Sequence, residues 1–428
     1  MKLNSLVKLF AVSSISAISA LVSTQSLANN KDFTLAYDSD NQSKMPSDLQ
    51  EIIDEFNSKN KTKLKLVKYN KNAPATLNLF VNDKFGSEND ILLNSKKFIS
   101  VSKMAELAKV KIDTTKLSKN PIFKTAELAD AKGNMIAYPL FISTAVMFYD
   151  KNAFRRAGLD EDNPPKTWSE MQNVLAKLSQ NGSSCPYTSS VPVFIHLDNV
   201  TALAGQNTIN HSSKNLHFNG LSQMRHIAKM TTWHQAGYFK TFGKDYQASE
   251  KFADGTCAII TTDSWEFNNF YDIKGRNLGV AMLPKHEEER HAQHPHTLIN
   301  GGYIWAGAGY SNNDYQNAVK FLNFLAEKDS QEQLLEHNFF IPLNKDTSLD
   351  SEEKDALKVM EASINAKNNG ASNNYSTLRA YKDVEEIAYK ELQNIWNGKK
   401  PAKVGLDDAV KHGNAAMNKK ANLKKHPF

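Results

Sequence analysis

Hydrophobic and polar positions alternate between strand-like and helix-like spacing in the first part of the chain. Residues 33–37 alternate as a strand does, and the apolar residues between 49 and 56 then recur on one face of a helix. Residues 63–69 and 89–93 are strand-like again. This order of strands and helices predicts an α/β lobe built on a parallel sheet.

The segment 133–154 is the centre of the predicted architecture. Pro139 favours extended backbone before it, and residues 145–149 form an apolar run of strand length. A chain that leaves one core here and enters another at once predicts two lobes with a cleft at the crossing. The small polar residues Ser143 and Thr144 are expected to face that cleft.

Helical spacing dominates the next part of the pattern. A short helix is predicted over 151–158, and Thr167 with Glu170 forms a capping box that opens a second helix. Residues 186–220 are polar with little periodicity, which predicts loops and short elements. Residues 221–236 return to helical spacing.

A buried strand is predicted to end at Asp263, Ser264 and Trp265. In an α/β sheet the ligand lies beyond the carboxyl ends of the strands, so these residues are expected at the cleft. Residues 278–284 form a further strand, and 300–305 are interpreted as a turn that leads into a strand. Later helices are predicted near 315–328, from a cap at Ser330 onward, near 384–396 and near 406–410. Phe340 lies in a Pro-containing loop after the helix that begins at Ser330.

Aromatic faces and hydroxyl groups at strand ends are suited to a sugar-like solute. On that chemistry the candidate ligand-binding residues are Tyr37, Ser39, Ser143, Thr144, Ser264, Trp265, Tyr303 and Phe340.

The first residues have the composition of an export signal. Lys2 and Lys8 give a basic start, residues 9–22 are apolar and small, and residues 26–28 form a small-x-small cleavage site. The sequence thus predicts a signal peptide over 1–28, a mature chain outside the cytoplasm, and a periplasmic location. No later stretch reaches the roughly 20 apolar residues that span a bilayer.

Composition excludes several classes of function. A formal net charge of +6 over 428 residues is too small for a nucleic-acid-binding surface. The chain has no nucleophile elbow, zinc-protease motif, phosphate-binding loop or dinucleotide-binding motif, so no enzyme activity and no cofactor are predicted. A secreted hydrolase that uses unrecognised carboxylates is the remaining enzymatic alternative.

Cys185 and Cys257 are the only cysteines. In an oxidising compartment such a pair forms a disulfide, and two buried free thiols are the alternative.

A histidine-rich run lies between His286 and His296 and includes His291 and His294. Its spacing matches no closed tetrahedral metal motif, so the run is interpreted as a solvated loop, with a metal site as the alternative.

Several segments resemble one family of proteins. Residues 153–160 (AFRRAGLD), 163–168 (NPPKTW) and 391–400 (ELQNIWNGKK) are similar to the extracellular solute-binding proteins of ABC importers, in the branch of the glycerol-3-phosphate and maltose binders. The resemblance implies a two-lobed periplasmic-binding-protein fold of type II, similar to maltose-binding protein, with a hinge between the lobes. It also implies a monomer that delivers a small solute to an inner-membrane permease and its ATPase, and cysteines with a structural role.

Lobe boundaries follow from the crossing and the return of the chain. The expected first lobe comprises residues 29–140 and 288–330, and the second comprises 141–287 and 331–428.

The family's phosphate pocket transfers only in part. A Ser of the family's pocket corresponds to Ser143 and a Gly to Gly302. At other pocket positions this chain has a different residue type from the family, namely at Ala73, Lys96, Asp263 and Phe340. Glu385 stands where the family has an Arg anchor, and Arg379 is the candidate to replace that anchor. The resemblance implies a ligand like glycerol-3-phosphate or a glycerophosphodiester, and a neutral sugar or polyol is the alternative.

Overall fold

The chain divides into two units in a computed structural model, Met1–Lys31 and Asp32–Phe428. The structure describes residues 33–39, 45–81, 96–113, 115, 134–210, 213, 215–271, 273–287, 296–344, 346–364 and 381–423. The predicted signal peptide, the predicted strand 89–93 and Arg379 lie outside these ranges.

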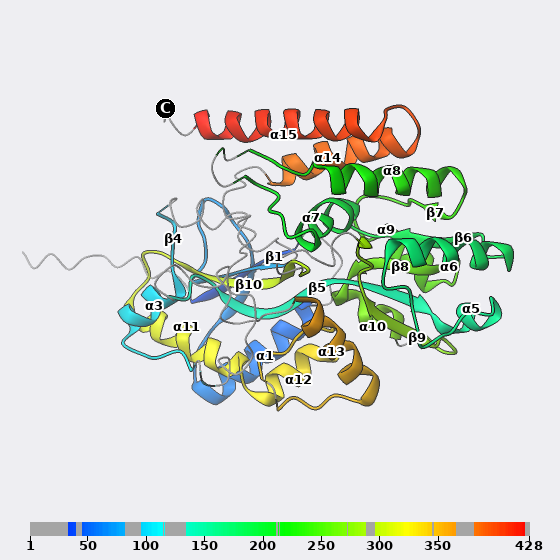
Figure 1. The fold of residues 1–428 in the computed structure, drawn as a ribbon. Helices are drawn as coiled ribbons and strands as arrows, with labels where there is room; N and C mark the ends of the chain where they lie inside the picture. The colour runs from blue at the N-terminus through cyan, green and yellow to red at the C-terminus, as the bar shows by residue number, and fades with distance from the viewer. Residues whose placement is uncertain are drawn as a thin grey trace, which may run out of the picture. The chain divides into compact units, whose positions relative to one another are not determined.

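A ten-stranded sheet forms the centre of the larger unit in the described part of the chain (Figure 1). Its order is β2-β1-β3-β10-β5-β8-β6-β7, with β4 paired to β10 and β9 paired to β5. The bounds are β1 (Thr34–Ser39), β2 (Lys65–Lys68), β3 (Leu77–Val81), β4 (Phe98–Ile99), β5 (Tyr138–Asp150), β6 (Cys185–Ser189), β7 (Phe239–Lys240), β8 (Cys257–Asp263), β9 (Leu278–Met282) and β10 (Ile299–Gly307). Strand β1 is parallel to β2 and β3, which confirms the parallel arrangement predicted for the first lobe.

Strand β5 joins the two halves of the sheet. It is continuous over 13 residues and almost wholly buried. Residues up to Thr144 pair with β10, and residues from Ala145 onward pair with β8 and β9. The predicted extended crossing is therefore one strand that changes its partners between Thr144 and Ala145.

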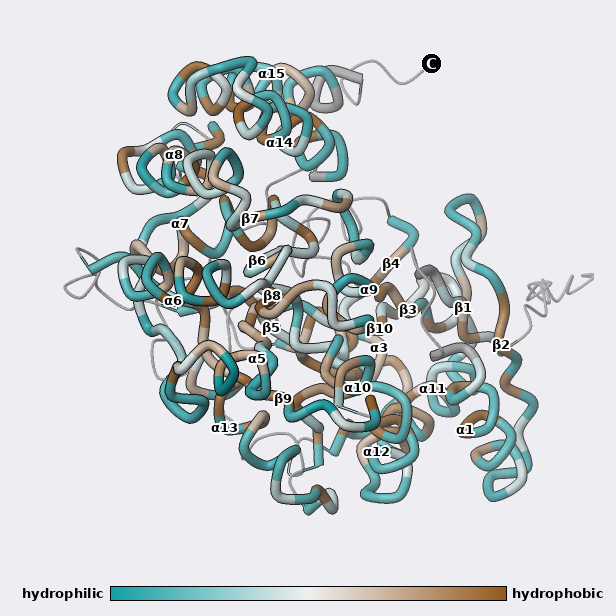
Figure 2. The backbone as a smooth tube through the Cα atoms, turned by 90° about the vertical axis from the view of Figure 1, so that its right-hand side faces the viewer, coloured by the Kyte–Doolittle hydropathy of each residue, from teal (hydrophilic) through white to brown (hydrophobic). Residues whose placement is uncertain are grey.

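Helices cover both faces of this sheet, with α8, α14 and α15 together on one side and α1, α11 and α12 on the other (Figure 1). In Figure 2 teal and brown positions both occur within single helices, as in amphipathic helices. The bounds are α1 (Met45–Asn60), α3 (Val101–Ala108), α5 (Lys151–Arg156), α6 (Trp168–Gln180), α7 (Val200–Leu203), α8 (Leu221–Gln235), α9 (Gln247–Ala253), α10 (Phe267–Tyr271), α11 (Asn312–Leu325), α12 (Lys328–Leu335), α13 (Ser351–Ile364), α14 (Tyr381–Trp396) and α15 (Ala402–Leu423). Two apolar clusters result, one involving α1, α11 and α13 and the other involving α6, α8, α14 and α15.

The caps of two helices test the predictions from sequence. Thr167 accepts a hydrogen bond from the Glu170 amide at 3.1 Å, and the Glu170 carboxylate accepts one from the Thr167 amide, which confirms the capping box of α6. The predicted cap at Ser330 is wrong, because α12 already begins at Lys328 and Ser330 is buried within it.

The prediction of mainly loops over 186–220 is only partly correct. This stretch contains most of β6, a π-helix over Phe194–Asn199, and α7. Some of its polar side chains are buried and satisfy backbone groups. Asn199 donates to the Phe194 carbonyl at 2.8 Å and accepts from the Leu298 amide at 2.8 Å. The polarity of Asn199 therefore reflects internal hydrogen bonding and not exposure.

The Gly-Gly pair after Asn300 lies inside β10, so its interpretation as a turn is wrong. Gly301 has φ +137°, and a Cβ at this position would lie 2.3 Å from the Phe141 carbonyl oxygen. The register against β5 shifts between Gly302 and Tyr303. These glycines therefore permit a close approach of β10 to β5.

We expect Gly301→Ala to lower the free energy of unfolding by about 2 kcal/mol or more, because both the backbone conformation and the new contact are unfavourable. Chemical denaturation measures this change. Gly309→Ala is the matched control, since Gly309 has φ +80° but open space around its Cβ position. Equal losses in the two variants would show that the close approach to Phe141 has no energetic importance.

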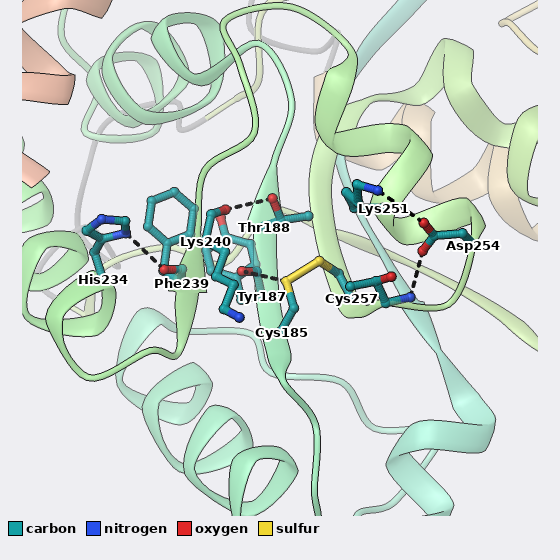
Figure 3. The surroundings of a disulfide bond; sticks show 10 residues. Cys185, Tyr187, Thr188, His234, Phe239, Lys240, Lys251, Asp254 and Cys257 are labelled. Carbon is teal, nitrogen blue, oxygen red and sulfur yellow. Dashed lines mark hydrogen bonds and ion pairs between the residues drawn. A yellow bond between two sulfur atoms is a disulfide. The ribbon is translucent and has the colours of Figure 1, made fainter. Parts of the chain in front are cut away.

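Cys185 and Cys257 form a disulfide between neighbouring parallel strands (Figure 3). The two residues are direct partners in the register of β6 and β8, and their Cα atoms are 4.5 Å apart. The bond therefore ties the first residues of these two strands together.

Candidate functional site

Polar side chains from three strands meet where β5 changes its partners. We call this group the polar node; it comprises Ser143, Thr144, Asp263, Ser264 and Asn300, all of which are buried. The Thr144 amide donates to Ser264 Oγ at 3.0 Å, and Asn300 is the register partner of Ser143. The ends of β8 and β10 and the middle of β5 are thus connected through polar groups.

Asp263 is the charged member of the polar node. Its carboxylate accepts hydrogen bonds from the Trp265 amide at 3.0 Å and from Asn300 Nδ2 at 2.5 Å. Complete burial raises the pKa of Asp263 above its ordinary value, although these donors and the nearby Ser143 hydroxyl favour the charged form. Asp263 is the last residue of β8, as the strand pattern predicted.

Two buried atoms of the polar node lack a partner. Ser143 Oγ and Asn300 Oδ1 form no hydrogen bond of good geometry with any described residue, and the two side chains are 0% and 4% exposed. The Ser143 hydroxyl lies close enough to Asp263 to favour the charged form of that carboxyl. Buried polar atoms are nearly always paired, so these two atoms need an explanation.

The aromatic candidates Trp265 and Phe340 both pack against the ring of Phe141. Phe141 lies 4.4 Å from Trp265 and 5.2 Å from Phe340, measured between ring centroids. A Cβ on Gly302 would come within 2.4 Å of the Phe141 ring. Trp265 is 8% exposed and Phe340 is fully buried, so these residues form a buried wall beside the polar node.

The other candidates are less closely associated with this group. The Tyr303 hydroxyl donates to the Asn300 carbonyl at 3.0 Å and thereby supports the start of β10. Tyr37 lies on β1, which is separated from β10 by β3 in the sheet. Ser39 ends β1, and its side chain lies outside the described set together with Arg379.

Sequence reasoning did not single out Asn300, Glu266 or Tyr246. Glu266 is 5% exposed and accepts a hydrogen bond from Asn269 at 3.2 Å. Burial raises the pKa of Glu266 to about 7, and the charge of Asp263 adds to this effect. The sequence pattern that could have predicted a site role for Asn300 is a polar residue directly before Gly-Gly in an apolar strand. The role of Glu266 depends on tertiary neighbours and has no local signal.

Comparison with known proteins gives the family. Residues 51–361 match the family model described as "Bacterial extracellular solute-binding protein". The chain belongs to this solute-binding protein family. It is 30% identical over 312 residues to the sn-glycerol-3-phosphate-binding periplasmic protein UgpB of Escherichia coli K12, covering 68% of this chain and 69% of the relative.

Solved structures of solute-binding proteins share the fold. UgpB from Mycobacterium tuberculosis, in complex with glycerophosphocholine, superposes with a TM-score of 0.70 at 16% identity and covers 90% of this chain and 98% of its own. Maltose-bound MalE3 of T. maritima gives 0.67 at 14% identity, with the same coverage of 90% and 98%. The predicted fold similar to maltose-binding protein is thus confirmed, and the chain is a receptor of the kind that serves ABC importers.

The family description also bears on location and activity. Its members are extracellular, and the Escherichia coli relative is named as a binding protein and not as an enzyme. None of the described helices is long and apolar enough to cross a membrane.

Part of the histidine-rich run has a structural role in this solute-binding protein. His286 Nε2 lies 3.1 Å from His226 Nδ1, and His226 Nε2 lies 2.9 Å from His196 Nδ1. These are hydrogen-bond distances between imidazoles, and burial lowers the pKa of His196 to about 3, which keeps that ring neutral. Within the described ranges no group of three His, Cys, Asp or Glu side chains is placed to hold a metal ion; His291 and His294 lie outside those ranges.

A cavity of about 700 Å³ lies in another part of this solute-binding protein, between β9 and α13. Its lining includes Lys151, Phe267, Arg276, Val280 and Val359. None of the ligand-binding residues predicted from sequence lines it. The cavity and the polar node are nevertheless adjacent, because Thr297 of the lining lies 2.6 Å from the Thr144 hydroxyl.

Proposed function

We propose that this solute-binding protein holds its solute at the polar node, between a first lobe of residues 29–140 and 288–330 and a second lobe of 141–287 and 331–428. Strand β5 supports a crossing in this part of the chain because it changes its pairing partners between Thr144 and Ala145, a few residues after the proposed boundary at 140. Rotation of the lobes about such a crossing closes a cleft around the solute.

The observation that carries this proposal is the pair of unpartnered atoms, Ser143 Oγ and Asn300 Oδ1. An unmet buried hydrogen bond costs about 1–3 kcal/mol, so it persists where another molecule supplies the partner. A solute with hydroxyl or amino groups would supply it. The aromatic wall formed by Phe141, Trp265 and Phe340 would support the apolar face of such a solute.

The names of the relatives point to the class of solute. The Escherichia coli relative is named for sn-glycerol-3-phosphate, and the mycobacterial structure contains glycerophosphocholine. We propose a solute of the glycerol-3-phosphate or glycerophosphodiester type, with a neutral sugar or polyol as the second candidate. The polar node contains hydroxyls, an amide and a carboxylate, so it suits the hydroxyl-bearing part of the solute. A phosphate would need a cation from elsewhere, and Arg379 is the candidate.

The proposed cellular role follows the same relatives. The segment 1–28 would direct export to the periplasm and be removed, and the mature chain would act as a monomer. Closure around the solute would present it to an inner-membrane permease, whose ATPase drives import.

Ser143→Ala tests the site. The apo protein should lose little stability because Ser143 Oγ forms no hydrogen bond of good geometry, and affinity for the solute should fall about fivefold or more, the equivalent of one hydrogen bond. A thermal-shift screen of the mature protein against glycerol-3-phosphate, glycerophosphodiesters, sugars and polyols finds the solute, and titration calorimetry measures affinity.

Thr262→Val is the matched control. Thr262 is also fully buried with an unpartnered hydroxyl, but it precedes Asp263 on β8 and so points to the opposite face of the sheet. Equal affinities of Ser143→Ala and the wild type would place the solute elsewhere, and an equal loss in both variants would show a general packing effect.

A further inference from the structure

Two neighbouring carboxylates at the end of β8 are buried without a cationic partner. Asp263 is 0% exposed and Glu266 is 5% exposed. Neither forms an ion pair with a Lys, Arg or His of the described ranges, and their neighbours are neutral donors such as Asn300 and Asn269. Buried carboxylates normally have a cation beside them.

The negative charge of this region also affects a tyrosine. Tyr246 immediately precedes α9, and burial together with the charges of Asp263, Glu266 and Glu385 raises its pKa well above the ordinary value. The charges of Asp263, Glu266 and Glu385 therefore combine into a negative potential around the Tyr246 hydroxyl. A negative potential of this kind attracts cations and disfavours a phosphate group.

The unpartnered atoms of the polar node give a second and independent indication. Asn300 donates through Nδ2 to Asp263, which leaves Oδ1 of the same amide as an acceptor without a donor. Ser143 Oγ, beside Asp263, can accept as well. The site therefore lacks a positive charge beside its carboxylates and a donor for Asn300 Oδ1.

A protonated amine supplies both of these. We infer that the solute carries a primary ammonium group, which lies beside Asp263 and Glu266 and donates hydrogen bonds to Asn300 Oδ1 and Ser143 Oγ. A quaternary ammonium has the charge without the donors, and a hydroxyl has a donor without the charge. Amino sugars and glycerophosphodiesters of ethanolamine both carry the required group. This inference rests on the proposed function, because it assigns the solute's chemistry at the same polar node.

Matched pairs of solutes test the inference with the mature full-length chain. Glucosamine is compared with glucose, and glycerophosphoethanolamine with glycerophosphocholine, by titration calorimetry at neutral pH. We expect the amine of at least one pair to bind about tenfold more tightly or better than its partner, as a charge-assisted hydrogen bond provides. The pair in which the amine binds more tightly shows whether the solute is an amino sugar or a glycerophosphodiester of ethanolamine.

Glu266→Gln should remove most of the affinity ratio between each amine and its matched partner, whatever its effect on the absolute affinities, and thermal melts establish that the variant is folded. Asp355→Asn is the control, because Asp355 is an exposed residue of α13 that pairs with Lys358; it should keep the preference. The inference is overturned if neither amine is preferred, or if the preference survives in Glu266→Gln. A different result would contradict the proposed function: every solute that binds the wild type would bind Ser143→Ala with unchanged affinity.

Discussion

Replacing Cys185 and Cys257 together by Ala is expected to lower the free energy of unfolding by about 4 kcal/mol in the chain-entropy description of disulfides. The bond closes a segment of the chain with a sequence separation of 72 residues, so its loss releases a large loop in the unfolded state. Both side chains are buried at the start of β6 and β8, where Ala is sterically compatible. Chemical denaturation of the oxidised wild type and the double variant measures the difference.

Reductant provides the control for this experiment. The melting temperature of the wild type should fall when the bond is reduced, whereas that of the Cys185→Ala/Cys257→Ala protein should not respond. If the double variant matches the oxidised wild type, the register of β6 and β8 is maintained by packing alone.

The second large effect concerns pH. Burial raises the pKa of Glu266 from 4.5 to about 7, so the folded state retains this proton over a range in which the unfolded state has lost it. Stability from this group is therefore present below about pH 4.5 and is lost as pH rises toward 7, with a total of about 3 kcal/mol. Glu266→Gln should remove that loss, and the variant should be more stable than the wild type at pH 8.

Denaturation at pH 5 and pH 8 measures this dependence. Glu250→Gln is the matched control, since Glu250 is an exposed residue of the nearby helix α9. Asp263 has a pKa raised in the same direction, so some dependence should persist in Glu266→Gln. If the two variants have identical pH profiles, Glu266 is not the titrating group.

Sequence patterns predicted the elements that depend on local interactions. The capping box of α6 needs only Thr167 and Glu170, which are three residues apart, and the structure confirms it. The strand that ends at Asp263 and the extended crossing through Ser143 were likewise visible as apolar runs with polar ends.

Features that depend on distant neighbours could not be predicted. Gly301 was assigned to a turn because glycine favours turns, but its role is set by the Phe141 carbonyl, which is remote in sequence. Asn199 was placed among loops because it is polar, although it is buried against the amide of Leu298. The environment of Glu266 has the same origin, since its burial depends on how α9, α10 and β8 assemble.

The grouping of several candidate residues was predicted, whereas their role in binding a solute stays a prediction. Ser143, Thr144, Asp263 and Ser264 were expected together, and the structure places them in one node. Trp265 and Phe340 were expected to contact the solute; that contact stays a prediction, and in the structure they pack on Phe141. Asn300 was missed because the pattern around it resembles a turn.

The continuity of β5 limits how this protein can evolve. Alternate residues of its second half belong to different cores, with Val146 and Phe148 in one and Met147 and Tyr149 in the other. Inserting or deleting one residue would exchange these two sets between the faces of the sheet. Descendants of this sequence can therefore change their specificity by substitution at Ser143 or its neighbours, whereas the length of the segment is fixed.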